Sequence, residues 1–273
     1  MTTTLDEARE AVTRATRAGG PDGVLMSEEV TSFVREQLAA QDLDGKSVCV
    51  IVPDATRSCP LPLLLGAVHG ALHGRASTMT VLVALGTHAA MSSEALARHL
   101  GYAEGNLEAT YPGLTVRNHE WWDPTTFAHL GVIPASRVEE LSEGRLSQDV
   151  PVRLNKAVVE HDVALVVGPV LPHEVVGMSG GNKYFFPGVA GQEIIDISHW
   201  LGALITSAEI IGTTKVTPVR ALIDEGASLI PAEKLALSVV GEAGSLALYS
   251  ISFGNTIASW ASAAEVCAAT HVT

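Results

Sequence analysis

The sequence predicts an α/β fold, with a parallel or mixed β-sheet that is flanked by helices. Three apolar runs rich in β-branched residues have the length of buried strands: "SVCVIV" at 47–52, "TMTVLVALG" at 78–86 and "DVALVVG" at 162–168. Segments with the periodicity of amphipathic helices come before, between and after these runs. Strands that alternate with helices are typical of a parallel sheet covered on both faces. We therefore expect a Rossmann-like sheet with its ligand site at the carboxyl ends of the strands.

The helices are predicted from their apolar periodicity and from residues that favour helix ends. Ser27 is a favourable N-cap, Pro60 suits a first turn and Gly101 suits a helix end. The predicted helices span residues 5–18, 27–41, 60–73, 92–101, 217–229 and 256–270. Further strands are predicted at 114–118, 235–240 and 246–252, and the polar stretch 102–160 is expected to contain an excursion or lid.

The composition indicates a globular chain and restricts its partners. Apolar residues make up 47% of the 273 residues and charged residues 17%, which disfavours a disordered or fibrous chain. The net charge of −13 disfavours a nucleic-acid partner, because phosphate contacts need clustered cations. The three cysteines lack CxxC spacing, so we expect neither a disulfide framework nor a structural zinc site. No apolar run approaches the roughly 20 residues of a membrane span. We expect a cytoplasmic protein without a membrane partner.

Polar side chains follow each of the three central strands, at the edge where open parallel sheets bind ligands. Asp54 and Arg57 follow the first strand, and Thr87 and His88 follow the second. The candidates after the third strand are His173, Ser179, Gly180, Gly181 and Lys183, with His199 further along the chain. Titratable residues grouped at one edge, several of them histidines, indicate a reaction site.

Each candidate also has an ordinary structural role, which stays open at this point. Asp54 can cap a helix, and Arg57 and Lys183 can be solvated surface cations. His88 can bond to backbone, His199 can be a satisfied core histidine, and the glycine pair can serve a tight turn. "SGGNK" lacks the pattern of a phosphate loop, and neither GxGxxG nor HExxH is present, so those three kinds of site are disfavoured.

Taken together, four features resemble the nickel-dependent lactate racemase family. They are "DATR" at 54–57, "ALGTH" at 84–88, "PHEVVGMSGGNKYFFPGVAG" at 172–191 and the later His199, and the likeness extends over most of the chain. The resemblance implies that residues 1–273 form the family's N-terminal catalytic and cofactor-binding domain, with the family's C-terminal domain absent from this chain. It implies an isomerase, a racemase or epimerase of 2-hydroxy acids.

The resemblance also implies a cofactor and its attachment. Lys183 would carry a covalently bound nickel-pincer nucleotide (pyridinium-3,5-bisthiocarboxylic acid mononucleotide nickel), and His199 would complete the square-planar coordination of the nickel. His88 and His173 would be the acid/base pair, one at each face of the substrate. The hydroxyl proton would be removed while the Cα hydride moves to the cofactor, and the resulting 2-keto acid would be reduced again from either face. Histidine suits both proton roles because its pKa is near 6.5.

The remaining candidates would bind substrate or cofactor. Arg57 offers a bidentate fork for the substrate carboxylate, and Asp54 would orient a neighbouring donor or contact the cofactor's ribose. The expected cofactor contacts are Thr87, Ser179, Gly180 and Gly181, with the glycines giving clearance. Glu174 and Asn182 replace an aromatic and a basic residue of many lactate-specific relatives, which points to other 2-hydroxy acids.

The implied partners are a small 2-hydroxy acid, the enzymes that make the cofactor, and a second copy of the chain in a homodimer. Two other functions stay open. One is a non-catalytic α/β domain that binds a ligand or nucleotide, and the other is a metal-dependent hydrolase that uses the same histidines.

Overall fold

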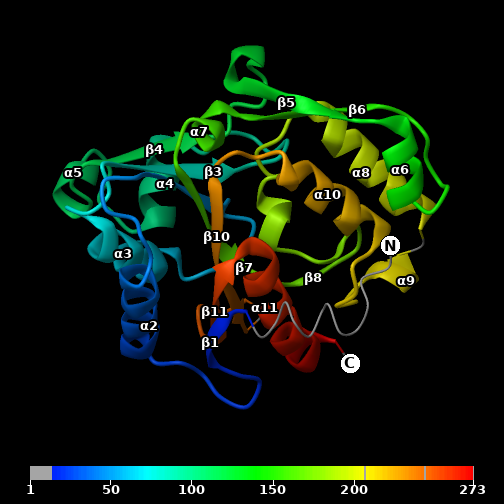
Figure 1. The fold of residues 1–273 in the computed structure, drawn as a ribbon. Helices are drawn as coiled ribbons and strands as arrows, with labels where there is room; N and C mark the ends of the chain where they lie inside the picture. Colours follow the sequence, from blue (N-terminus) through cyan, green and yellow to red (C-terminus); the bar gives the residue numbers. More distant parts are fainter. Residues whose placement is uncertain (1–13, 206, 243, 273) are drawn as a thin grey trace.

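The computed structural model describes residues 14–205, 207–242 and 244–272. A seven-stranded sheet lies at its centre, in the order β1–β11–β10–β7–β2–β3–β4 (Figure 1). The strands are β1 (Thr16–Gly19), β2 (Ser47–Pro53), β3 (Thr78–Ala84), β4 (Leu114–Asn118), β7 (Val163–Pro169), β10 (Glu233–Gly241) and β11 (Leu248–Asn255). Strands β10, β7, β2, β3 and β4 run parallel, whereas β11 is antiparallel to both of its neighbours. The prediction of a mixed α/β sheet is confirmed.

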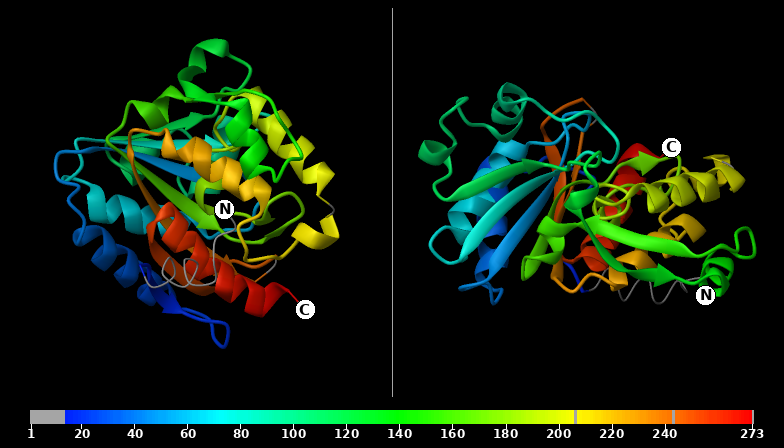
Figure 2. Two further views of the ribbon diagram at one scale, coloured as in Figure 1. Left: turned by 45° about the vertical axis from the view of Figure 1, so that its right-hand side comes forward. Right: turned by 90° about the horizontal axis from the view of Figure 1, so that it is seen from above.

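Both faces of the sheet are buried, which explains the continuous apolar runs of its central strands. On β2, Val48, Val50 and Val52 enter one hydrophobic cluster, while Cys49 and Ile51 enter another on the opposite face. The helices that cover the first face are α2 (Ser27–Ala39), α3 (Leu61–Leu72) and α4 (Ser93–Leu100). Figure 2 shows the opposite face covered by α8 (Gln192–Leu204), α10 (Pro218–Ser228) and α11 (Thr256–His271).

The remaining elements lie outside the central sheet. An antiparallel pair, β5 (Phe127–Ile133) and β6 (Val150–Asn155), forms the core of the excursion. The short elements are α5 (Leu107–Thr110), η1 (Pro124–Thr126), α6 (Ala135–Leu141), α7 (Lys156–Val159), β8 (Pro172–His173), β9 (Gly177–Met178), η2 (Gly181–Tyr184) and α9 (Ser207–Ile210). Strand β6 is bonded to the segment that follows η2, because Asn155 N donates to Val189 O at 3.0 Å and Gly191 N donates to Arg153 O at 2.9 Å.

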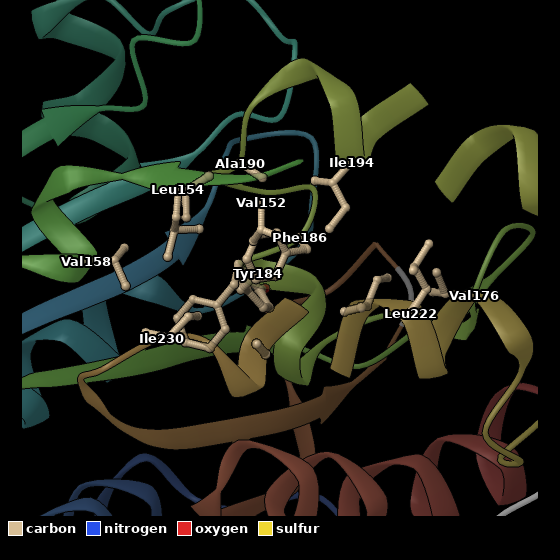
Figure 3. Packing of buried hydrophobic residues seen from close by; sticks show 14 of the residues in the cluster. Val152, Leu154, Val158, Val176, Tyr184, Phe186, Ala190, Ile194, Leu222 and Ile230 are labelled. Atoms are coloured by element: carbon tan, nitrogen blue, oxygen red, sulfur yellow. The ribbon is translucent and has the colours of Figure 1, made fainter. Parts of the chain in front are cut away.

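Aromatic residues anchor the segment that carries Lys183. Tyr184 and Phe186 pack with Val152 of β6 inside the second cluster (Figure 3). Phe185 and Phe186 are fully buried. Buried aromatic side chains contribute a large apolar area each, so the backbone around Lys183 is held firmly in place.

The structure corrects the sequence prediction at three places. Residues 16–19 form the edge strand β1, paired with β11, and not the end of a helix over 5–18, of which residues 5–13 lie outside the described part. Pairing at a sheet edge overrides local periodicity there. The N-cap of α2 is Met26, whose N–H donates to Glu29 at 2.6 Å, so Ser27 is the first helical residue. Helix α8 was not predicted.

Within the described residues, we find no helix with the length and apolar character that crossing a bilayer requires.

Candidate active site

A cleft opens at the carboxyl ends of the central strands, at the topological switch point of the sheet. After β2 the chain adds β3 and β4 on one side, and after β7 it adds β10 on the other. The loops after β2 and β7 therefore diverge and leave a crevice. The cavity there measures about 270 Å³. Its lining includes Asp54, Arg57, Thr87, His88, His173, Ser179, Gly180, Lys183 and His199. The structure thus brings together every candidate except Gly181.

A carboxylate–histidine pair forms one wall of the cleft. One oxygen of Asp54 accepts hydrogen bonds from the backbone N–H (3.1 Å) and hydroxyl (2.6 Å) of Thr56. The other lies 2.5 Å from Nδ1 of His88. Burial alone would raise the pKa of Asp54, but the hydrogen bonds from Thr56 and His88 outweigh burial, and the pKa is lowered. The charged carboxylate holds the His88 ring proton on Nδ1 and leaves Nε2 able to accept a proton.

The loop that carries His88 is fixed by residues that the sequence analysis did not select. The indole N–H of Trp121 donates to the His88 carbonyl at 2.9 Å, and the ring of Trp121 meets that of Trp122 edge-on. The Gly86 N–H donates to the Gly188 carbonyl at 2.9 Å, which ties this loop to the segment after η2. The tryptophan pair was visible in the sequence, but nothing in its spacing indicated contact with this loop.

His173 is held in the opposite neutral tautomer to His88. Its Nδ1 accepts the Val175 N–H at 3.1 Å, so the proton of the neutral ring is on Nε2. Burial and then the positive charge of Lys183 lower the pKa of His173 to about 3, although Glu174 opposes this shift. The neutral tautomers of the two rings therefore differ: His173 donates from Nε2, whereas His88 accepts at Nε2.

Lys183 is half-buried in the cleft, on the short helix η2. Among the described residues, no side chain or carbonyl forms a hydrogen bond or ion pair with its amine. Burial lowers the pKa of Lys183 to about 8, and the charges of Arg57 and Arg220 add to this effect. An amine with this pKa is partly uncharged at neutral pH, and it can act as a nucleophile.

The two glycines before Lys183 are required by packing within the protein. Gly180 and Gly181 have φ angles of 84° and 58°, which favour glycine. A Cβ on Gly180 would lie 2.7 Å from Val170 Cγ2, and one on Gly181 would lie 2.8 Å from Trp260 Cβ. The sequence predicted clearance for a cofactor. That clearance stays a prediction, and the close protein neighbours of both absent side chains give the glycines a packing role as well; of the two, Gly180 lines the cleft.

The hydroxyl of Ser179 is used within the same turn. It accepts the Leu171 N–H at 2.9 Å, and the Ser179 carbonyl accepts the Trp260 indole N–H at 3.0 Å. Thr87 lines the cleft from an exposed position beside His88. Of these two predicted cofactor contacts, Thr87 has the freer side chain.

A buried arginine forms hydrogen bonds with the backbone of the glycine turn. Arg220 of α10 donates to the carbonyl oxygens of Gly180 (3.1 Å) and Met178 (2.5 Å). Its guanidinium lies 4.2 Å from the ring centroid of Trp260. The periodicity of residues 217–229 predicted the helix but not the role of Arg220, because a buried cation has no signature in helical periodicity.

Asn182 points away from the cleft into a polar network. Its amide donates to Asp224 at 2.9 Å, and its carbonyl accepts the Thr256 hydroxyl at 2.6 Å. Burial raises the pKa of Asp224. Asn182 therefore supports the turn, whereas Glu174, the other departure from lactate-specific relatives, lines the cleft.

His199 lies on α8 with one ring nitrogen committed to its own helix. Its Nδ1 is 2.7 Å from the Ile195 carbonyl, so the ring proton is on Nδ1 and the lone pair is on Nε2. A neutral imidazole in this form is a common metal ligand. The described residues contain no group of three or more His, Cys, Asp or Glu side chains placed to hold a metal ion.

A second buried histidine supports the segment after η2. The ring of His119 is fully buried, its Nδ1 accepts the Asn155 amide at 3.1 Å, and its Nε2 donates to the Ala190 carbonyl at 3.2 Å. Burial lowers the pKa of His119 to about 4. The neutral ring satisfies both neighbours at once.

The sequence pattern of the lactate racemase N-terminal domain matches residues 28–212, well over half of the chain. This chain belongs to that family. The resemblance seen in the sequence is therefore confirmed.

Known relatives support this family membership. A lactate racemase from Thermoanaerobacterium thermosaccharolyticum is 28% identical over 167 residues, covering 58% of this chain and 34% of the relative. A crystal structure of a Thermotoga maritima protein superposes with a TM-score of 0.78 at 26% identity, covering 92% of this chain and 59% of that protein. The lactate racemase apoprotein from T. thermosaccharolyticum superposes with a TM-score of 0.62 at 19% identity, covering 95% of this chain and 54% of that one. This last likeness shows a shared fold. The chain spans about a third of the curated relative and little more than half of the two solved chains.

Proposed function

We propose that this chain is the catalytic, cofactor-binding domain of a 2-hydroxyacid racemase or epimerase. The observation that carries the proposal is the complementary protonation of two histidines at one cleft. His88 is held by Asp54 as an acceptor at Nε2, whereas His173 is held by the Val175 N–H as a donor at Nε2. Exchange of handedness needs one group that removes the hydroxyl proton and one that returns it, in either order.

The substrate's carboxylate has a ready partner in Arg57. Among the described residues, no acceptor forms a hydrogen bond with the Arg57 guanidinium, and this side chain lines the same cleft as both histidines. A guanidinium binds a carboxylate through two parallel hydrogen bonds. Carboxylate binding would fix the 2-hydroxy group between His88 and His173.

The residues also fit the nickel-pincer nucleotide of the family. No described residue bonds to the amine of Lys183, whose lowered pKa suits covalent attachment, and Nε2 of His199 carries the lone pair that would coordinate nickel. When bound, the cofactor would accept the Cα hydride of the substrate and return it. Cofactor attachment that neutralises Lys183 would remove one of the causes that lower the pKa of His173, so this ring would become a better proton carrier.

The decisive experiment is intact-mass and nickel analysis of the protein after coexpression with the enzymes that make the cofactor. We expect one cofactor mass on Lys183 and one equivalent of nickel. Absence of both would refute the cofactor assignment. A panel of 2-hydroxy acids, followed by chiral chromatography, would then identify the substrate.

Variants of the two histidines test the catalytic roles. His88→Gln and His173→Gln are expected to abolish enantiomer exchange while nickel loading stays unchanged. His129→Gln, at an exposed position on β5, is the matched control and should keep full activity. Loading with nickel and binding of a 2-hydroxy acid without any exchange would favour the non-catalytic binding domain.

A further inference from the structure

The cleft has the features of a carbonyl-binding site even without a nickel cofactor. Lys183, the one lysine among the described residues of its lining, lies beside a cation that can bind a carboxylate, Arg57, and two histidines that can transfer protons. We propose that, in the chain without its cofactor, Lys183 condenses reversibly with a small 2-oxo acid to form a Schiff base. This inference does not depend on the racemase assignment.

The first support is the position of the amine. Lys183 lines the cleft and has no acceptor among the described residues, so none of these residues must be displaced before it reacts. Two guanidinium groups, those of Arg57 and Arg220, act on it from different elements, and Glu174 is the carboxylate that opposes them. A lysine in a desolvated site near other cations is activated as a nucleophile, because the uncharged amine is favoured.

The second support is the recognition of the acid group. A 2-oxo acid carries a carboxylate directly beside its carbonyl carbon. Arg57 would bind that carboxylate, which would bring the carbonyl towards the other residues that line the cleft. A neutral ketone of similar size lacks this anchor, and it should react far less.

The third support is the arrangement of proton donors and acceptors. The N–H at Nε2 of His173 can donate to the carbonyl oxygen, and the free Nε2 of His88 can take a proton from the attacking amine. The nitrogen lone pair forms the C–N bond while the π pair of the C=O bond moves to oxygen. That oxygen leaves as water with one proton from the nitrogen and one from the medium, and a protonated imine remains.

The test is reductive trapping on protein made without the cofactor-forming enzymes. Purified protein is incubated with pyruvate and sodium cyanoborohydride, whose hydride reduces the imine carbon to a stable secondary amine. We expect one adduct per chain, with a mass gain of one pyruvic acid less one oxygen atom, and peptide mapping should place it on Lys183. Labelling that is half-maximal near pH 8 would match the pKa of about 8.

Matched variants complete the test. Lys183→Arg should abolish the adduct, whereas Lys215→Arg, at an exposed position, should retain it. Arg57→Gln should raise the pyruvate concentration for half-maximal trapping about tenfold or more, and acetone should replace pyruvate poorly. Circular dichroism would check that the variants are folded.

Two results would overturn the proposal: no adduct, or adducts spread over the exposed lysines of the wild-type protein. Neither result bears on cofactor attachment, which is measured separately on coexpressed protein. A confirmed adduct would mean that a 2-oxo acid can block the attachment point of the cofactor.

Discussion

His119 makes the stability of this domain depend on pH in a way that can be calculated. The ring is fully buried between Asn155 and Ala190, and its pKa falls from 6.5 to about 4 on folding. Between these values the unfolded chain binds more protons than the folded chain. The stability that the neutral His119 ring contributes is therefore fully present well above pH 6.5 and is lost as the pH falls towards 4. From pH 7 to pH 5 the loss from this one group is about 2 kcal/mol.

Urea unfolding of the wild type and His119→Gln at pH 7 and pH 5 measures this effect. The wild type should lose about 2 kcal/mol more than His119→Gln between the two pH values, because glutamine does not titrate. His173 also contributes below pH 6.5, but it is present in both proteins and cancels in the comparison. The exposed His129→Gln should behave like the wild type. Equal losses in the wild type and His119→Gln would refute the reasoning.

Two further predictions concern the cleft. Gly180→Ala places a Cβ 2.7 Å from Val170 at a φ of 84° and should cost about 2–6 kcal/mol in urea unfolding, more than Gly86→Ala, whose Cβ meets nothing within 4 Å. Equal costs would contradict the packing argument. Asp54→Asn removes the charge that holds the His88 proton on Nδ1, so turnover of the loaded enzyme should fall about a hundredfold or more while nickel content is unchanged. An unchanged turnover number would show that Asp54 does not act through His88.

Most of the sheet could be predicted because its buried strands are continuous apolar runs in the sequence. The runs at 47–52, 78–86 and 162–168 became β2, β3 and β7 with small changes at their ends. Strand β1 could not be predicted, since its partner β11 lies at the other end of the chain. Helix α8 was missed because its N-cap, Gly191, provides no side-chain cap, although Gln192, Asp196 and His199 recur on its exposed face at helical spacing.

The cleft could be predicted from one rule of topology, that ligands bind beyond the carboxyl ends of parallel strands. This rule brought together His88, from the loop after β3, with His173 and Lys183, both from the segment after β7. It did not find Arg220 or Trp121, which act on backbone carbonyls from elements far away in the sequence. Supporting residues of this kind depend on tertiary packing, so a single sequence does not reveal them.

The lowered pKa of Lys183 exists only in the completed fold. Its causes are burial and the charges of Arg57 and Arg220, which come from loops and helices on either side of it in the sequence. In an unfolded or half-synthesised chain, the lysine would keep its ordinary pKa of about 10.4 and would be almost wholly protonated at neutral pH. Any reaction that needs the free amine therefore discriminates between finished and unfinished chains. The proposed attachment of a cofactor at Lys183 would therefore follow completion of the fold, and misfolded copies would escape modification.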